Sequence, residues 1–421
     1  MRKHTLRQAG GLCHAVISFA RARLAGPAVA AVIVLPAMGQ AASTSSTPTM
    51  LYGTLDTQAS TAATEAARGV GMAMFEFDWA SFEPEPSTFS SSYLASVKAE
   101  LDAYHAAGMD ITLGLGMQDA PSWVFKLADA TYVNQDGNVS TEADFVFSAA
   151  VRAAATTYLD QIAASLPLSD FWAIRLTSGG DSEMVYPGGG TYWAFNSSAL
   201  TGNGLPAGMT KNPYPSWIPG TPGLTPGQIG QWVTWYVGGL DNVTDWQMQT
   251  LNGLGFTGYY ETITPGSGTR PNVLTAEEQQ NMPDSTTGVG AVWNLYYSGL
   301  WYKSRVVAYV SSVADESGDD DTCQSSDDSL PLTSPVMNTW SATRWIARIA
   351  KEYGMLVGGE NPGYGLPPSL DWFYTDVSGS GEMAIALAQA RSCGFSVFYW
   401  AHDTNLWIGT VPFATYVAMI K

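Results

Sequence analysis

A closed barrel of eight parallel strands, each followed by a helix, is the fold class that the 421-residue sequence predicts. Strand-like runs alternate with helical stretches about eight times along the chain, and this alternation is typical of an α/β protein with a parallel sheet. Each unit takes about 47 residues, a length that suits a (β/α)8 TIM barrel with insertions. No glycine-rich dinucleotide-binding motif follows the first predicted strand, which disfavours an open doubly wound sheet. We therefore expect a single-domain barrel with long loops on its C-terminal face.

The N-terminal segment is predicted to be a secretory signal that precedes the barrel. Residues 1–23 contain five basic side chains and no acid, and an apolar run of about 15 residues follows over 24–38. A membrane-spanning helix needs about 20 apolar residues, so a cleavable signal is favoured over a membrane anchor. The expected organisation is a signal peptide over residues 1–41, a Ser/Thr/Ala-rich lead-in over 42–68 and the catalytic barrel over 69–421, with export to the periplasm or the medium.

The amino-acid composition indicates which kinds of molecule this protein can bind. The chain is 46% apolar and only 13% charged, whereas about 25% charge is usual for soluble domains, so a disordered chain and a coiled coil are both excluded. Removal of residues 1–41 leaves 14 basic against 37 acidic side chains, a formal net charge of −23. Such a surface repels nucleic acid, and no later stretch is apolar enough to cross a membrane. The 15 Trp and 20 Tyr residues suit a carbohydrate, whose C–H faces stack on aromatic rings. The sequence makes no prediction of oligomeric state.

The individual strands are predicted from runs of β-branched and aromatic residues between turn-forming residues. Seven clear strands cover residues 71–79, 110–117, 171–177, 255–260, 305–311, 355–359 and 395–400, and a weaker one, taken as the third, lies at 131–134. The clearest helices cover residues 91–107, 145–165 and 339–353. Gly108 and Gly354 each come shortly before a strand, as expected where a helix ends in a left-handed cap.

Three long loops follow predicted strands. They cover residues 187–228, 262–290 and 314–334, and loops after strands lie on the C-terminal face, where barrels carry their active sites. Cys323 falls in the last of these loops, whereas Cys393 directly precedes the final strand and belongs to the opposite face. A strand of five or six residues separates the two faces by about 17–20 Å, and bridged Cα atoms lie within about 7 Å. We therefore expect free thiols, although an exported protein permits a disulfide.

The candidate chemistry depends on two glutamates. Glu183 follows the strand at 171–177 after a pair of glycines, and Glu360 follows the strand at 355–359 in the same way. Strands four and seven lie on opposite sides of an eight-stranded barrel, so the two carboxylates can face each other across a central pocket. Glycoside hydrolysis needs one protonated carboxyl group for the leaving oxygen and one carboxylate as nucleophile or base. Either glutamate taken singly is also compatible with a helix-capping or ion-pairing role.

Short blocks of the sequence resemble known glycoside hydrolases. Residues 77–86 and 113–123 are similar to glycoside hydrolase family 42, the β-galactosidases. Residues 180–187 and 358–361 are also similar to the β-amylase family, in which such segments carry the catalytic acid and base. The resemblance implies Glu183 as general acid/base and Glu360 as nucleophile in a retaining enzyme, or as base in an inverting one. Ser182 stands where retaining families usually place Asn.

Further residues at predicted strand ends are candidates for binding the substrate. Two pairs end the first two strands, others flank the glutamates, and the resemblance implies a Trp as the floor of a sugar subsite after the last strand. These candidates are Asp78, Trp79, Gln118, Asp119, Tyr186, Tyr260, Asn361, Trp400 and His402. Polar packing inside the barrel is an equal alternative for Asp78 and Trp79, and a structural role is an equal alternative for His402.

No metal or cofactor is expected. No Cys/His set has the spacing of a zinc site, and the acidic run at 315–328 matches no EF-hand, which favours a solvated loop over a calcium site. The sequence thus predicts a secreted, cofactor-independent glycosidase, with a retaining enzyme acting on a β-linked, galactoside-like substrate as the first choice. Two alternatives remain open: an inverting β-amylase-like α-glucan hydrolase, and a barrel that binds carbohydrate without catalysis.

Overall fold

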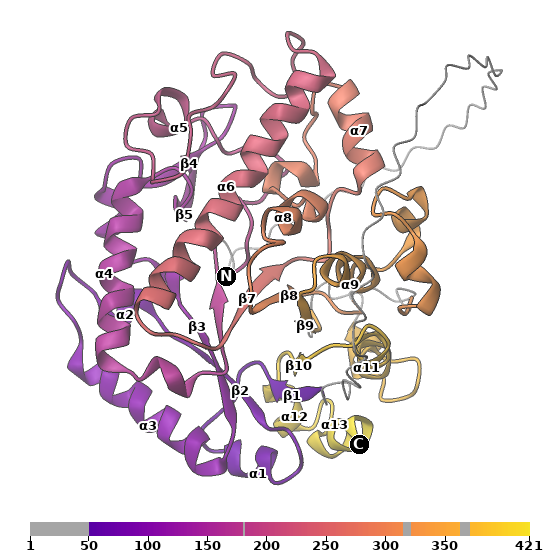
Figure 1. The fold of residues 1–421 in the computed structure, drawn as a ribbon. Helices are drawn as coiled ribbons and strands as arrows, with labels where there is room; N and C mark the ends of the chain where they lie inside the picture. The colour runs from indigo at the N-terminus through magenta and orange to yellow at the C-terminus, as the bar shows by residue number, and fades with distance from the viewer. Residues whose placement is uncertain (1–49, 180–181, 315–320, 363–370) are drawn as a thin grey trace, which may run out of the picture. The chain divides into compact units, whose positions relative to one another are not determined.

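A computed structural model describes residues 50–179, 182–314, 321–362 and 371–421 of the chain. It confirms the closed (β/α)8 barrel, with eight strands that are all parallel (Figure 1). Around the barrel the order is β1–β10–β9–β8–β7–β6–β3–β2, which closes because β1 pairs with both β10 and β2. The predicted signal peptide at 1–41 lies outside the described residues, as do Gly180, Asp181 and part of the acidic run.

The barrel strands are short and mostly buried. They are β1 (Leu51–Thr54), β2 (Met72–Glu76), β3 (Asp110–Gly114), β6 (Ala173–Leu176), β7 (Tyr259–Thr264), β8 (Val306–Val310), β9 (Leu356–Glu360) and β10 (Val397–Trp400). Because successive side chains point to opposite faces of a strand, each strand supplies one set to the barrel interior and another to the helices. A small apolar cluster that includes Met72, Met74 and Tyr399 fills the interior, and a much larger core lies between strands and helices.

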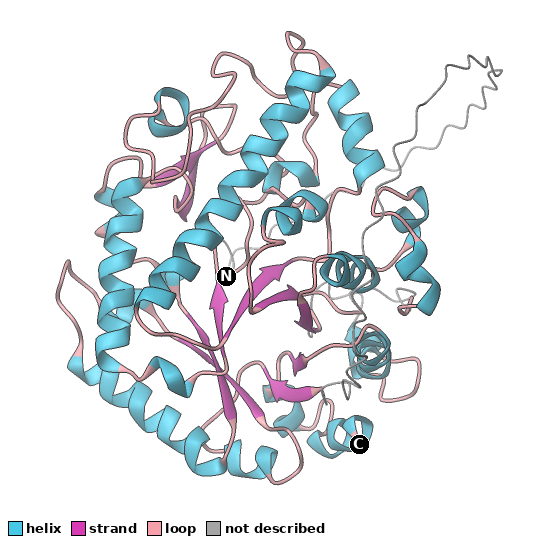
Figure 2. Cartoon of the chain, viewed as in Figure 1, coloured by secondary structure: helices cyan, strands magenta, loops and turns pink. Residues whose placement is uncertain are grey.

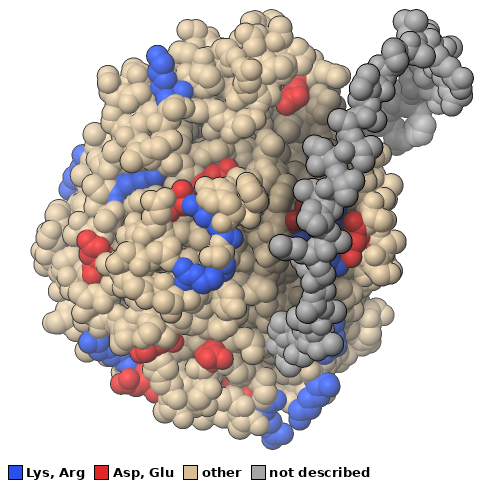
Figure 3. Space-filling model, in the orientation of Figure 1, with Lys and Arg blue, Asp and Glu red and all other residues tan. Residues whose placement is uncertain are grey.

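The helices surround the strands (Figure 2). They are α1 (Ala62–Ala66), α2 (Trp79–Phe82), α3 (Ser91–Ala107), α4 (Ala149–Ser165), α5 (Ser197–Thr201), α6 (Pro226–Gly253), α7 (Pro271–Gln279), α8 (Trp293–Gly299), α9 (Ala342–Glu352), α10 (Asp371–Thr375), α11 (Glu382–Ser392), α12 (Thr404–Ile408) and α13 (Phe413–Ile420). α3 begins at a Ser90 cap and ends at Gly108 with φ 74°, as the sequence predicts. None of the helices in the described part of the chain is long and apolar enough to cross a membrane. The face of the molecule in Figure 3 carries few charged side chains, in keeping with the low charge content.

Two predictions about the strands were wrong: one barrel strand was missed, and one strand outside the barrel was counted as part of it. The number of barrel strands is therefore unchanged. β1 lies inside the segment predicted as a lead-in at 42–68, and its four residues become a strand because β10 and β2 pair with it on either side. The run at 131–134 instead forms β4 (Thr131–Val133), which pairs antiparallel with β5 (Val139–Ala143) in a separate hairpin outside the barrel. β6 and β9 are therefore still the fourth and seventh barrel strands.

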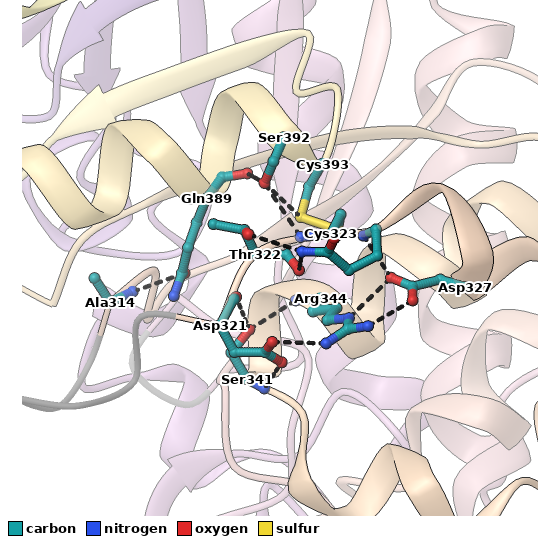
Figure 4. The surroundings of a disulfide bond; sticks show 11 residues. Ala314, Asp321, Thr322, Cys323, Asp327, Ser341, Arg344, Gln389, Ser392 and Cys393 are labelled. Carbon is teal, nitrogen blue, oxygen red and sulfur yellow. Dashed lines mark hydrogen bonds and ion pairs between the residues drawn. A yellow bond between two sulfur atoms is a disulfide. The ribbon is translucent and has the colours of Figure 1, made fainter.

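The prediction of free thiols was also wrong. Cys323 and Cys393 form a disulfide with their Cα atoms 5.0 Å apart (Figure 4). The segment after β8 does not stay at the C-terminal face but packs against α9, where Arg344 pairs with both Asp321 and Asp327 at 2.6 Å. Cys323 is thus carried to the end of α11, so the strand length that separates the two faces does not separate the two sulfur atoms. In the described part of the acidic run, Asp321 and Asp327 pair with Arg344 and Asp328 pairs with Lys351, while residues 324–326 and Asp328 are exposed.

We predict that the double variant Cys323→Ser/Cys393→Ser loses unfolding free energy. The two cysteines are 70 residues apart, and the loop-entropy relation assigns a disulfide closing such a loop an upper value of about 4 kcal/mol. Urea unfolding of the wild type with and without dithiothreitol measures the effect. The reductant should bring the wild type to the midpoint of the variant and leave the variant unchanged; coincident midpoints for oxidised wild type and variant would contradict the prediction.

Candidate active site

A pocket of about 250 Å³ opens among the C-terminal ends of the barrel strands. Its polar lining comes from residues at or just after five different strands. They are Asp56, Glu76, Arg175, Ser182, Glu183, Ser311 and Glu360. The pocket therefore combines both glutamates singled out from the sequence, at the face of the barrel where active sites are found.

Arg175 connects the carboxylates inside the barrel. Its Nε lies 2.8 Å from Glu261 Oε2, and its Nη1 lies 3.1 Å from Glu360 Oε2. Its Nη2 donates to the hydroxyl of Tyr309, and the guanidinium lies 4.4 Å from the centre of the Tyr309 ring. Burial alone would lower the pKa of Arg175, but Tyr309 and the two carboxylates hold it well above its ordinary value. All three nitrogens are thus engaged, and the cation serves to neutralise neighbouring carboxylates.

Glu261 is the buried partner of this arginine. Its side chain is fully buried, and Thr112 donates to its Oε1 at 3.4 Å. Burial raises the pKa of Glu261, while Arg175 opposes this rise. Because a buried carboxylate without a cation is costly, Glu261 and Arg175 depend on each other. We assign Glu261 the role of compensating the charge of Arg175 from the side away from the pocket.

Hydroxyl groups at the end of β8 donate hydrogen bonds to both candidate catalytic carboxylates. The hydroxyl of Tyr309 on β8 donates to Glu360 Oε2 at 2.6 Å. Two residues later, Ser311 Oγ donates to Glu183 Oε1 at 2.6 Å. Residues at i and i+2 point to the same face of a strand, so Tyr309 and Ser311 both face the barrel interior. β8 therefore positions groups that come from opposite sides of the barrel.

The glycines before the two glutamates act in different ways. Gly179 has φ 114°, a conformation that other residues avoid, and it belongs to the turn after β6. Gly358 and Gly359 have no such angle; a Cβ on Gly359 would lie 2.5 Å from the carbonyl oxygen of Val310. Close packing between β9 and its neighbours is thus the reason for the second pair. Glu183 is turned into the pocket by a tight turn in which the amide of Ser178 donates to its carbonyl oxygen.

A third carboxylate, that of Glu76, lines the pocket. Glu76 ends β2, and its Oε1 accepts from the Gly116 amide at 2.8 Å and from Gln118 Nε2 at 3.0 Å. The side chain is open to solvent in the pocket although barrel atoms surround it on the other sides. That burial raises the pKa of Glu76, while Gln118 and Arg175 oppose the rise. Gln118, predicted as a substrate ligand, therefore contacts the pocket through Glu76.

Three predicted binding residues point away from the pocket. Trp79 is fully buried and stacks on Tyr158 at 4.9 Å, so it offers no face to a sugar. Tyr260 lies near the start of β7 and points outward, where its hydroxyl donates to Asn252 Oδ1 at 2.8 Å. Trp400 points outward from β10 and is fully buried, while its neighbour Tyr399 points inward. Tyr260 and Trp400 point outward because successive side chains of a strand alternate between the barrel interior and the helices, whereas Trp79 begins α2 beyond the end of β2.

Two other predicted binding residues, Tyr186 and Asn361, form hydrogen bonds within the protein instead. The Tyr186 ring stacks on Tyr236 at 4.1 Å, and its hydroxyl donates to the carbonyl oxygen of Tyr236 at 2.7 Å. Asn361 Nδ2 donates to Glu382 Oε1 at 2.8 Å, and its Oδ1 accepts from the Ala401 amide. Both side chains are buried. The prediction that they bind substrate is therefore wrong for this conformation.

The remaining candidates lie at the surface near the strand ends. Asp78 is half-buried and caps α2 by accepting from the Ser81 amide at 2.8 Å. Asp119 is exposed, and burial together with Asp78 raises its pKa. His402 is exposed and has φ 56°. None of the three belongs to the lining of the pocket.

Sequence reasoning missed several residues of the site. Arg175 could have been found, because a charged side chain in the buried strand Ala-Ile-Arg-Leu is unusual unless it is paired. Tyr309 carried no such signal, since an aromatic residue in a buried strand is ordinary. Ser311 and Asp56 follow strands as many structural residues do. Only the closed barrel brings these residues to the glutamates.

Two solved structures share the fold of this chain. The catalytic domain of beta-amylase from Paenibacillus polymyxa has a TM-score of 0.60 at 13% identity, over 88% of this chain and 97% of that one. Beta-galactosidase from the psychrophilic Marinomonas ef1 has a TM-score of 0.53 at 12% identity; the match covers 83% of this chain and 54% of that protein. No family model matches the sequence, and no curated protein matches it. The likeness is one of fold, to proteins of the two kinds that the sequence blocks resemble.

We predict that Arg175→Met destabilises the protein by about 3–5 kcal/mol, because it leaves Glu261 buried without its cation. The double variant Arg175→Met/Glu261→Met should recover most of the loss. Without Arg175 the pKa of Glu261 rises further, so the unfolding free energy of the single variant should fall as pH rises from about 5 to 8 relative to the double variant. Chemical unfolding at both pH values measures this. Equal stability of the wild type and the single variant would contradict the assigned ion pair.

Proposed function

We propose that this protein is a glycoside hydrolase in which Glu183 is the general acid/base and Glu360 is the nucleophile. The observation that carries the proposal is that these two carboxylates, from the fourth and seventh barrel strands, line one pocket. Their surroundings differ in the way that two opposite roles require. Glu360 lies 3.1 Å from a guanidinium and accepts from a tyrosine hydroxyl, whereas Glu183 accepts from a neutral serine hydroxyl.

The roles follow from these contacts. Arg175 and Tyr309 both bind Oε2 of Glu360 and so orient this carboxylate, as a nucleophile needs. Glu183 would donate its proton to the glycosidic oxygen while Glu360 attacks the anomeric carbon, which forms a glycosyl-enzyme intermediate. Glu183, now ionised, would then remove a proton from water as the water displaces Glu360. Each glutamate ends the cycle in its starting state, and no cofactor takes part.

The charge of the pocket supports a neutral sugar as substrate. In the described part of the chain four carboxylates line it, those of Asp56, Glu76, Glu183 and Glu360. The one cation that lines it there, Arg175, is engaged with Glu261, Glu360 and Tyr309. Carboxylates bind hydroxyl groups well and repel a sugar acid. The volume of about 250 Å³ suits one sugar ring at a time. The resemblance to family 42 makes a β-linked, galactoside-like substrate the first choice.

An inverting enzyme acting on an α-glucan is the second candidate. The likeness to the beta-amylase catalytic domain, which spans nearly all of that chain, favours it. In that reading Glu360 activates water instead of attacking carbon. The two reactions differ in the anomer released, and proton NMR of the first product distinguishes them.

We predict that Glu183→Gln and Glu360→Gln each lower the turnover of the preferred aryl glycoside, by about 10²–10⁴-fold for the acid/base. The panel contains aryl β-galactoside, β-glucoside and β-glucuronide, together with starch. The glucuronide should remain uncleaved because of the four carboxylates. Asp78→Asn is the matched control, since this residue caps a helix outside the pocket. If wild type cleaves nothing yet binds sugars by calorimetry, the chain is a non-catalytic carbohydrate-binding barrel.

We also propose that the protein is exported and that its signal peptide is removed after about residue 41. The basic segment and the following apolar run support this. Intact-mass measurement of the protein recovered outside the cytoplasm should give a chain that begins near Ala42. Recovery of the full-length chain inside the cell would contradict it.

A further inference from the structure

A buried carboxylic acid lies directly behind the rim of the pocket. Asp403 follows β10 by three residues and is fully buried. Its Oδ1 accepts from the backbone amide of Asp56 at 2.9 Å. Its Oδ2 is buried and has no hydrogen-bond partner in the described part of the chain. Asp56 follows β1, is exposed, and lines the pocket together with Glu183 and Glu360. The mechanism above uses neither aspartate.

The turn that carries Asp56 is held at its other residues by backbone and hydroxyl groups, and Thr54 Oγ1, which bonds Thr57 Oγ1 at 2.9 Å, donates to Glu65 Oε2 at 2.7 Å. The Leu55 amide donates to the carbonyl oxygen of Trp400 at 3.0 Å. Thr57 Oγ1 donates to the carbonyl oxygen of Thr54, and the Tyr104 hydroxyl donates to that of Thr57. Asp403 contacts the turn at Asp56 itself. The protonation state of Asp403 therefore affects Asp56, the residue of this turn whose charged side chain lines the pocket.

The surroundings of Asp403 contain acids and phenols. The titratable groups that face it are Asp56 after β1, Glu65 on α1, Tyr104 on α3, Tyr374 on α10 and Tyr416 on α13. None of these is a cation. Burial, and then the charge of Asp56, raises the pKa of Asp403 to about 7. Below that pH the neutral carboxyl group accepts the Asp56 amide without repelling the Asp56 carboxylate. Above it, a buried negative charge lies beside Asp56 with no compensating cation.

We propose that Asp56 binds a hydroxyl group of the sugar in the pocket, and that Asp403 is the positioning residue that holds Asp56 there. This inference rests on the proposed function, because it assigns a substrate contact in the same pocket. A hydrogen bond between a carboxylate and a sugar hydroxyl is worth about a 10- to 100-fold change in affinity. Asp403 contributes to it through the backbone of Asp56 and does not touch the substrate.

The test uses four variants of the full mature protein, with the best-cleaved aryl glycoside as probe. Asp56→Ala should raise KM about 10- to 100-fold with a smaller change in kcat. Asp403→Leu, which removes the acceptor, should raise KM at both pH 6 and pH 8. Asp403→Asn keeps the acceptor and cannot ionise, so it should restore the KM that Asp403→Leu raises. We expect kcat/KM of the wild type to decline between pH 6 and 8 through ionisation of Asp403, and this contribution should be absent from Asp403→Asn. Asp376→Asn is the control, since this aspartate lies in a surface turn with Ser378.

A second readout is independent of turnover. Because the folded-state pKa of Asp403 is raised, the wild type should lose unfolding free energy as pH rises from about 4 to 7 relative to Asp403→Asn. Wild-type KM in both Asp56→Ala and Asp403→Leu would overturn the inference while leaving the glycosidase assignment intact. If the wild type cleaves no glycoside, the proposed function fails. The inference is then tested by calorimetry, which compares the affinities of the wild type and Asp56→Ala for galactose and for maltose. Absence of binding, or equal affinities for wild type and Asp56→Ala, would then overturn it.

Discussion

The site depends on one buried cation. Arg175 projects from β6 into the barrel interior, where it compensates Glu261 and Glu360 and stacks over Tyr309. Burial raises the pKa of Glu261, and Arg175 opposes this rise. The same guanidinium binds Oε2 of Glu360, so one cation connects a buried structural carboxylate with a carboxylate that lines the pocket. Because an unpaired buried charge is costly, Arg175 and Glu261 depend on each other.

β8 adds the second constraint. Its inward-facing hydroxyl groups, from Tyr309 and Ser311, each bind one of the two glutamates. A short strand is stiff because its neighbours bond to it on both sides, so these donors hold their partners at a set separation across the pocket. The same strand leads into the segment that the disulfide ties to α11.

The sequence alone was enough for the barrel and for the pair of glutamates. Alternation of strands and helices predicts a parallel sheet, and an acid that directly follows a buried strand must lie at one face of it, so Glu183 and Glu360 could be assigned. The binding residues were harder. Tyr260 was predicted to end a strand, but β7 continues to Thr264, so this side chain lies near the start of the strand and faces outward. Trp79 was assigned to the end of a strand that stops at Glu76, and Trp400 was assigned from the resemblance; both are buried in the surrounding core.

Only the tertiary structure determined which side chains contact one another. The charge balance around Arg175, the contact between Asp403 and Asp56, and the pairing of Cys323 with Cys393 join residues that are distant in sequence. Local patterns carry information about periodicity and about the ends of elements. They carry none about which loop folds back along a helix or which inward side chains meet, because those contacts are set by closure of the barrel. The sequence thus determined the fold class and the two catalytic candidates, and the closed barrel determined their partners and the pocket that they share.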